Sequence, residues 1–152
     1  MRHTFFKLWT HGIFQTPAET MISPELEAML HYQIEKHLVE QGCDVSKVGG
    51  MPDHVHFLFA QNPLISLHET FHFVKLMTTR WYQLHDFKAS FHKFQWAEGY
   101  CAYSVSESLL EKTRIFIETQ ATIHLKMGTL EEIERLNALH NVDVRDWGFE
   151  ND

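Results

Sequence analysis

Hydrophobic and polar positions along this chain follow two periods, one typical of helices and one typical of strands. Helical spacing of apolar residues predicts helices over residues 24–41, 66–84 and 106–126, and a short final helix from residue 129. Aromatic and β-branched content with alternation predicts strands over 3–15, 44–48 and 54–60, and an extended stretch over 94–105, with a turn at 49–53. This order predicts an α+β fold, an antiparallel sheet with helices packed on it.

Short polar motifs mark the predicted helix starts. Ser66 stands where it can cap the second helix. Ser108 with Glu111, and Thr129 with Glu132, match the capping box, in which both side chains bond to the backbone of their own helix.

Length and composition indicate one soluble domain. The chain has 152 residues, 44% of them hydrophobic and 22% charged, so residues 1–152 suit a single domain with a real core. No apolar run is long enough to span a bilayer and no signal peptide is evident, so we expect a cytoplasmic protein that contacts no membrane.

The net charge of −7 argues against a general nucleic-acid binder. The charge is unevenly distributed, however. Residues 75–126 carry 7 basic and 5 acidic groups, whereas residues 127–152 carry 2 basic and 7 acidic groups. The middle third can therefore present a basic surface, while we expect the acidic tail to be solvated or packed away from any phosphate backbone.

A candidate metal-binding pair lies on the predicted strand 54–60. Side chains alternate between the two faces of a strand, so Val55 and Phe57 should face the core while His54 and His56 share the other face, about 7 Å apart at their Cα atoms. Two such imidazoles can converge on one divalent ion. The chain has 12 histidines, so about one His-x-His triplet is expected by chance, and the triplet alone favours two surface histidines over a metal site.

A rival metal motif, His68-Glu69-Thr70-Phe71-His72, matches the HExxH pattern of zinc metalloproteases. On a helix, His68 and His72 would lie one turn apart with Glu69 as a base. The metzincin continuation is missing, because Lys75 stands where its glycine would be. A zinc hydrolase stays open as an alternative function.

Several motifs in register resemble a known family, the small HUH single-tyrosine DNA transposases of insertion sequences and repeat-associated elements. The segment 96–108 matches that family's W-x-x-G-Y-x-A-[FY]-S-V-S-x-S stretch, and the segment 50–58 matches its G-x-x-D-H-V-H-x-L block. The family's lysine in the following helix corresponds to Lys75. The resemblance covers nearly the whole chain.

The chain departs from the family in the block that carries the nucleophile. The family shows Y-I-x-N-Q-x-x-H-H, and residues 116–124 read Phe-Ile-Glu-Thr-Gln-Ala-Thr-Ile-His. Gln120 and His124 fit the block, whereas Phe116 replaces the nucleophilic tyrosine and Thr119 and Ile123 replace an asparagine and a histidine. Phe116 has no hydroxyl and so can form no phosphotyrosyl intermediate. A natural loss and an introduced Tyr→Phe change both fit, and Tyr100 and Tyr103 are candidate substitute nucleophiles.

The resemblance implies a ferredoxin-like, RNA-recognition-like fold, a homodimer, and metal-dependent cleavage and strand transfer of single-stranded hairpin DNA. It implies catalytic positions at Phe116, His54 and His56, and a site for Mg²⁺ or Mn²⁺ formed by His54, His56 and Gln120. A catalytically silent DNA-binding module on the same fold is the alternative. The candidate DNA contacts are cations with one stacking aromatic: Lys75, Arg80, Lys88, Lys93, Tyr100, Lys112 and Arg114.

Overall fold

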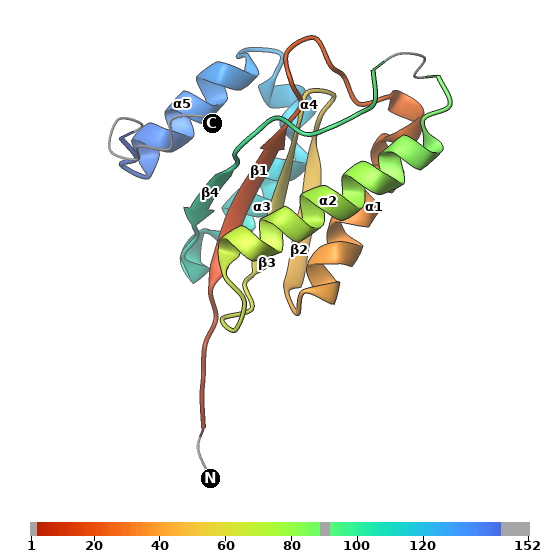
Figure 1. The fold of residues 1–152 in the computed structure, drawn as a ribbon. Helices are drawn as coiled ribbons and strands as arrows, with labels where there is room; N and C mark the ends of the chain where they lie inside the picture. The colour runs from red at the N-terminus through yellow and green to blue at the C-terminus, as the bar shows by residue number, and fades with distance from the viewer. Residues whose placement is uncertain (1–2, 89–91, 144–152) are drawn as a thin grey trace.

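The computed structural model describes residues 3–88 and 92–143, so the end of the acidic tail lies outside the described residues (Figure 1). Its elements are β1 Trp9–Gln15, α1 Pro24–Glu40, β2 Asp44–Met51, β3 His54–Ala60, α2 Leu67–His85, β4 Cys101–Ser104, a 3₁₀ turn Glu107–Leu109, α3 Leu110–Glu118, α4 Gln120–Ile123 and α5 Thr129–Leu139. No helix within the described ranges combines the length and the apolar character needed to cross a membrane.

The strands form one four-stranded sheet in the order β2-β3-β1-β4, and every neighbouring pair is antiparallel. Together with the chain order β-α-β-β-α-β, this is the ferredoxin-like arrangement. The predicted α+β architecture is confirmed.

One face of the sheet carries the main hydrophobic core. Val55, Phe57 and Phe59 of β3 are fully buried there with Phe14 of β1, and they pack in one cluster with apolar residues of α1 and α2. Figure 1 shows α2 crossing in front of the sheet on this side. The predicted alternation along β3 is therefore confirmed.

The opposite face is covered by α3, α4 and α5 (Figure 1). A second, smaller apolar cluster there joins Ile13 of β1 and Tyr103 of β4 to Ile133 of α5. His54 and His56 project from β3 on this side and are fully buried. Helices thus cover both faces, and the histidine pair lies between sheet and helices rather than at the surface.

Two predicted strand boundaries were wrong. β1 begins at Trp9 and not at His3, because its partner β3 ends at Ala60, directly opposite Trp9. β2 continues through both glycines of the predicted turn as far as Met51, which pairs with His54. The turn is therefore shorter than predicted.

The predicted extended stretch 94–105 contains only the short strand β4. The amide of Ala97 still donates to the carbonyl of Gln15 on β1, but Gly99 has a φ of +71°, which breaks the extended path before Cys101.

The predicted third helix is also divided, since α3 ends at Glu118 and α4 begins at Gln120. The hydroxyl of Thr119 donates to the carbonyl of Ile115 at 2.8 Å, a bond that bends helices.

The close approach of α3 to the sheet depends on Gly49. A Cβ at Gly49 would lie 2.9 Å from the carbonyl oxygen of Ile117, which is closer than ordinary packing allows. A glycine at this point of β2 lets α3 lie against the sheet, and with it the neighbouring Phe116.

Of the helix caps predicted at Ser66 and Ser108, the structure contains the one at Ser66 and not the one at Ser108. Ser66 caps α2 in a complete capping box with Glu69, as the N-cap prediction requires. The box predicted at Ser108 is absent, because Leu109 is the N-cap of α3 and Glu111 pairs instead with Arg114.

Candidate functional site

His54 is held in a fixed orientation from one side. Its Nδ1 donates to a carboxylate oxygen of Asp53 at 2.7 Å, and the other oxygen of Asp53 accepts from the hydroxyl of Thr129 at 2.7 Å. A carboxylate on the far nitrogen fixes the tautomer of a histidine and directs its Nε2 to a ligand. Nε2 of His54 accordingly faces the helices.

After the break at Thr119, the first residue of α4, Gln120, and the residue that follows the helix, His124, both lie close to His54. The Oε1 atom of Gln120 lies 3.0 Å from Nε2 of His54 and 3.0 Å from Nε2 of His124. His124 donates from its Nδ1 to the carbonyl of Met127 at 3.0 Å, so its Nε2 is also directed inward. The tip of the glutamine thus lies between two inward-facing imidazole nitrogens.

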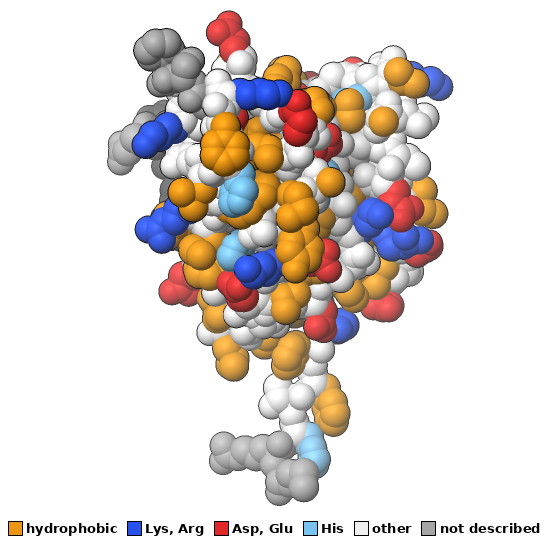
Figure 2. Space-filling view, turned by 90° about the vertical axis from the view of Figure 1, so that its right-hand side faces the viewer, with side chains coloured by type: hydrophobic (Ala, Val, Ile, Leu, Met, Phe, Trp, Pro, Cys, Tyr) orange, Lys and Arg blue, Asp and Glu red, His pale blue; other side chains and the backbone are white. Residues whose placement is uncertain are grey.

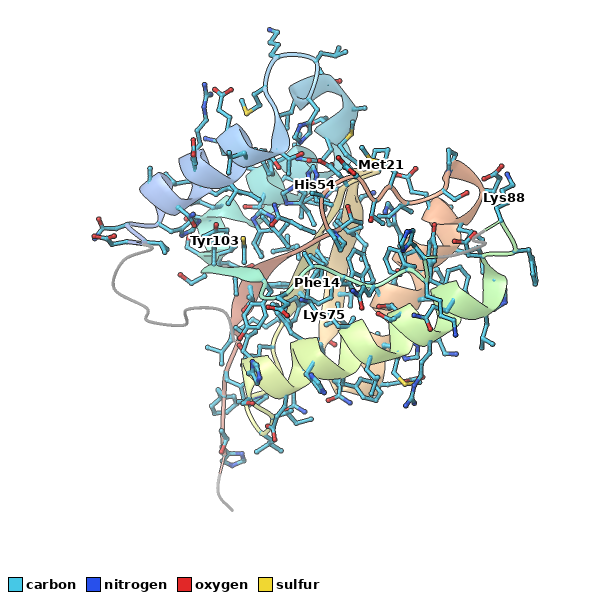
Figure 3. All side chains as sticks on the ribbon, turned by 45° about the horizontal axis from the view of Figure 1, so that its top comes forward. Phe14, Met21, His54, Lys75, Lys88 and Tyr103 are labelled. Carbon is cyan, nitrogen blue, oxygen red and sulfur yellow. The ribbon has the colours of Figure 1, made fainter. Side chains whose placement is uncertain are left out.

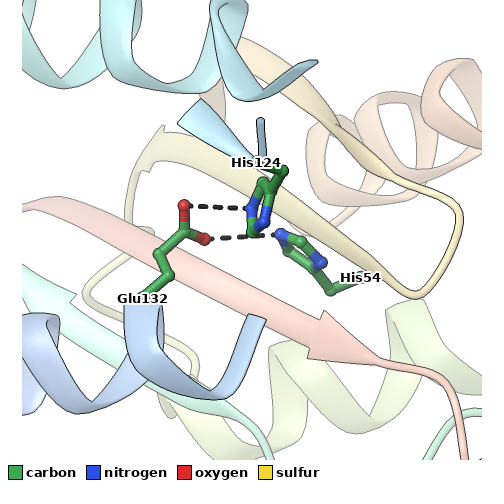
Figure 4. Close-up of side chains that lie close together, drawn as sticks. All are labelled: His54, His124 and Glu132. Atoms are coloured by element: carbon green, nitrogen blue, oxygen red, sulfur yellow. Dashed lines mark ion pairs between the residues drawn. The ribbon is translucent and has the colours of Figure 1, made fainter. Parts of the chain in front are cut away.

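Glu132 of α5 completes the site. The prediction that Thr129 and Glu132 form a capping box was wrong. Glu132 is only 2% exposed, and its carboxylate lies 2.7 Å from Nε2 of His56, 3.4 Å from Nε2 of His54 and 3.1 Å from Nε2 of His124. Figure 4 shows the carboxylate facing the rings of His54 and His124, with one oxygen directed at each ring. Neither side chain caps α5, because both point into the histidine site.

His11 of β1 extends the network behind His56. Nε2 of His11 lies 2.8 Å from Nδ1 of His56, and both rings are buried. Since Nε2 of His56 donates to the Glu132 carboxylate, a neutral His56 accepts at Nδ1 from His11. Sequence reasoning missed His11, because no spacing connects it to the strand pair.

Hydrogen bonds and burial shift the pKa values of Glu132, His54, His56 and His11 in different directions. Burial alone would raise the pKa of Glu132, but hydrogen bonds from His54 and His56 outweigh it and lower that pKa. Burial opposes the charge on His54, yet hydrogen bonds to Glu132 and Asp53 raise its pKa. Burial lowers the pKa of His56, and lowers that of His11 to about 3. The hydrogen bonds therefore favour the charged forms of His54 and Glu132, whereas burial favours the neutral forms of His56 and His11.

Phe116, at the position of the family's nucleophile, lies beside this network in the same chain. Its half-buried ring packs edge-on against His56 at 5.5 Å and against His11 at 6.0 Å between ring centroids. The helix position is thus the one that the resemblance implies, but the side chain offers no nucleophilic atom.

The donor atoms fit a divalent metal ion. One ligand atom from each of His54, His124 and Glu132 lies within 4.8 Å of the others, and within the described ranges this is the single group of its kind. Of the predicted ligands, His54 and Gln120 contact each other, whereas His56 is bonded to Glu132. Two of the three clustered groups, His124 and Glu132, were not among the predicted ligands.

The rival motif on α2 has another explanation. Glu69 is used by the capping box of α2, and His68 is exposed, with its Nδ1 3.3 Å from the hydroxyl of Tyr100. In the part of the chain that the structure describes, no third ligand group joins His68 and His72. Nothing in this arrangement supports the zinc hydrolase.

Three of the predicted DNA-contacting cations have partners within the protein. Lys75 donates to the carbonyls of Ala97 and Gly99, and Figure 3 shows it pointing toward Phe14 beneath the sheet. Lys88 pairs with Glu25 at 2.6 Å. Arg114 pairs with two acidic neighbours on its own helix. These cations are less available to a phosphate than the sequence suggested.

The other predicted contacts are more accessible. Arg80, Lys93 and Lys112 are exposed and form no ion pair with any described residue. Tyr100 is 38% exposed, with its ring edge-on to Phe71. Figure 2 shows Lys and Arg spread singly over one face, several of them beside Asp or Glu, with no continuous basic patch. The DNA contacts of these residues stay predictions.

The two candidate substitute nucleophiles differ in accessibility. Tyr103 is 4% exposed and its hydroxyl donates to Asn137 at 2.6 Å. Burial raises the pKa of Tyr103 well above its usual range, which disfavours the phenolate. Tyr100 reaches solvent but lies on the α2 side of the sheet.

Comparison with known proteins identifies the family and supports the fold. The family described as "Transposase IS200 like" matches residues 4–120, well over half of the chain. No curated protein sequence matches significantly. A crystal structure of a Deinococcus radiodurans protein assigned as a transposase is similar at 22% identity and a TM-score of 0.62, covering 79% of this chain and 95% of its own. A REP-associated tyrosine transposase bound to a REP hairpin is similar at 12% identity and a TM-score of 0.58, covering 100% of this chain and 93% of its own. The chain belongs to the IS200-like transposase family.

Proposed function

We propose that this transposase-family chain binds single-stranded hairpin DNA next to a divalent metal ion held at the His54 site, and that it does not cleave the DNA through a covalent tyrosine intermediate. The observation that carries the proposal is the ring of Phe116, packed 5.5 Å from His56 at the nucleophile position. Residues 1–152 would act as one domain.

The missing hydroxyl removes the covalent step. In a tyrosine transposase the phenol oxygen loses its proton and bonds to the DNA phosphorus, while the bond from phosphorus to the 3′ oxygen breaks and that oxygen takes up a proton. A phenyl ring has no oxygen to form the first bond. Phe116 keeps the packing against His56 and loses the chemistry.

A metal ion would supply charge stabilisation at the phosphate. The buried nitrogen and oxygen donors of His54, Gln120, His124 and Glu132 would hold it, and the ion polarises a phosphate oxygen when bound. The resemblance predicts Mg²⁺ or Mn²⁺ for this role. It also predicts a homodimer, which we retain as part of the proposal.

Hairpin DNA is the proposed partner because one protein with the same fold is bound to a REP hairpin. On this chain the exposed cations Arg80, Lys93 and Lys112, with Tyr100 as a stacking platform, are the proposed contacts. The partnered cations leave few free charges, so the affinity should be modest.

The test compares the chain with its Phe116→Tyr variant on a labelled single-stranded hairpin in the presence of Mn²⁺. We expect hairpin binding by both proteins and a covalent adduct, resistant to denaturation, with the tyrosine variant alone. Binding without an adduct in either protein would support hairpin binding and would show that more of the catalytic site is lost than the hydroxyl at position 116. Failure of both proteins to bind the hairpin would reject the proposal.

Control variants identify any other nucleophile. An adduct with the unchanged chain would contradict the role given to Phe116. The Tyr100→Phe and Tyr103→Phe variants would then show which hydroxyl had reacted.

A further inference from the structure

The ligand groups at the histidine site form a set different from the one that the motif resemblance implies. The carboxylate of Glu132 lies 3.4 Å from Nε2 of His54 and 3.1 Å from Nε2 of His124. Ligands about 2.0–2.1 Å from a tetrahedral ion are separated by about 3.3 Å. The two contacts use different oxygens of Glu132, and one ligand atom from each of the three residues lies within 4.8 Å of the others, so a small closure of the side chains would bring all three donors to a tetrahedral ion.

The outer hydrogen bonds favour the same three-residue set. Nδ1 of His54 is occupied by Asp53 and Nδ1 of His124 by the carbonyl of Met127, which leaves both Nε2 atoms directed at the carboxylate. Such bonds to the second nitrogen are typical of metal-binding histidines. His56 differs, because both its nitrogens are used, one by His11 and one by Glu132. Its geometry suits holding Glu132 in place.

The ligand set His54, His124 and Glu132 differs from the family pattern because Glu132 comes from α5. The family match ends at residue 120, before α5, so Glu132 lies outside it, whereas His124 fits the family's motif block. The Oε1 atom of Gln120 also lies 3.0 Å from each of the two imidazole nitrogens, so an amide oxygen is available as a fourth donor.

The chemistry of these donors determines which ion they suit. Two imidazoles with one carboxylate are a common zinc set, and imidazole affinity rises from Mn²⁺ through Co²⁺ and Ni²⁺. Mg²⁺ demands octahedral oxygen ligands and retains several waters. A buried site with two nitrogen donors offers neither.

We propose that His54, His124 and Glu132, assisted by Gln120, bind a borderline transition-metal ion such as Zn²⁺ in preference to Mg²⁺, and that this ion fastens α5 to β3 and α4. The inference rests on the divalent-ion part of the proposed function. It excludes His56 as a ligand and replaces Mg²⁺ or Mn²⁺ by a borderline transition-metal ion such as Zn²⁺. Glu132 is the ligand supplied by the C-terminal helix.

The test titrates chelator-treated protein with Zn²⁺ and separately with Mg²⁺, by calorimetry and by the thermal unfolding midpoint. We expect one Zn²⁺ per chain, a rise in the midpoint with Zn²⁺, and much weaker binding of Mg²⁺. Glu132→Gln should weaken Zn²⁺ at least about tenfold. The matched control is His72→Ala, an exposed histidine of the rival motif, which should leave Zn²⁺ affinity unchanged.

Three results would overturn the inference: equal affinities for Mg²⁺ and Zn²⁺, unchanged Zn²⁺ affinity in Glu132→Gln, or loss of Zn²⁺ binding in His72→Ala. Should Glu132→Gln fail to fold, the half-buried His124→Asn provides the same comparison. Co²⁺ substitution adds a spectroscopic check, because strong visible absorption is expected for a tetrahedral site and weak absorption for an octahedral one.

Hairpin binding measured in chelator keeps the two proposals distinguishable. Zn²⁺ binding without hairpin binding would reject the proposed function and leave the ligand assignment intact. Hairpin binding with a preference for Mg²⁺ would reject the ligand assignment alone.

Discussion

Glu132 accepts a hydrogen bond from Nε2 of His56 at 2.7 Å, although the two residues are 76 positions apart in the chain. This contact ties the C-terminal helix to the second strand of the central hairpin. Both side chains are buried, so the bond lies where an unpaired charge would be expensive.

The first prediction concerns the stability contributed by Glu132. Glu132→Ala leaves buried histidine donors without their acceptor and should lower the free energy of unfolding by about 3–5 kcal/mol in chelator. The measurement is urea denaturation. Its neighbour Glu131 is exposed and, among the described residues, pairs with Arg135 alone, so Glu131→Ala should change stability by less than about 1 kcal/mol. Equal losses in the two variants would mean that the buried network contributes nothing specific.

The sheet and its faces could be predicted from the sequence because they depend on local periodicity. Alternation along β3 assigned Val55 and Phe57 to the core and the two histidines to the other face, as the structure has them. The position of Phe116 beside that pair followed from the motif resemblance. Burial of the histidines could not be predicted, since it depends on helices that follow much later in the chain.

The role of Glu132 was missed because its residue type and position also fit a helix-capping motif. Thr129 and Glu132 have capping-box spacing, and nothing local distinguishes a carboxylate that caps its own helix from one that crosses to a strand. One signal was available, since Glu132 shares the helix face of Ile133 and Leu136, which pack on the sheet. An acid on the apolar face of a helix indicates a buried partner.

A second prediction distinguishes two roles for Lys75. Its amine donates to the carbonyls of Ala97 and Gly99 in the segment before β4, so Lys75→Met should leave both unsatisfied and cost about 1–3 kcal/mol. Urea denaturation measures the loss. Arg80→Met, an exposed change on the same helix, should alter stability by less than about 0.5 kcal/mol. Weaker hairpin binding by Lys75→Met at unchanged stability would instead indicate a direct phosphate contact.

A third prediction concerns which cations meet DNA. Lys112 is exposed and has no ion pair with a described residue, whereas Lys88 pairs with Glu25 at 2.6 Å. Lys112→Ala should weaken hairpin binding and reduce the slope of log affinity against log salt by about 0.7, the value for one phosphate contact on a single strand. Lys88→Ala should leave the slope nearly unchanged. Fluorescence anisotropy over a salt series measures both, and an equal drop in slope would contradict the distinction.

A fourth prediction concerns acid stability through His31 of α1. Its Nε2 is buried and has no hydrogen-bond partner among the described residues. Burial, aided by the positive charge of Lys47, lowers the pKa of His31 from 6.5 to about 4. Between pH 6.5 and about pH 4, His31 is therefore protonated in the unfolded chain and neutral in the folded chain. Stability contributed by neutral His31 is complete above pH 6.5 and is lost as the pH falls toward 4, by up to about 1.4 kcal/mol per pH unit. His31→Gln should flatten the curve of unfolding free energy against pH in this window, whereas His72→Gln, an exposed change, should leave it as it is. Chemical denaturation at a series of pH values tests the difference, and parallel curves for the two variants would show that His31 does not titrate as its burial requires.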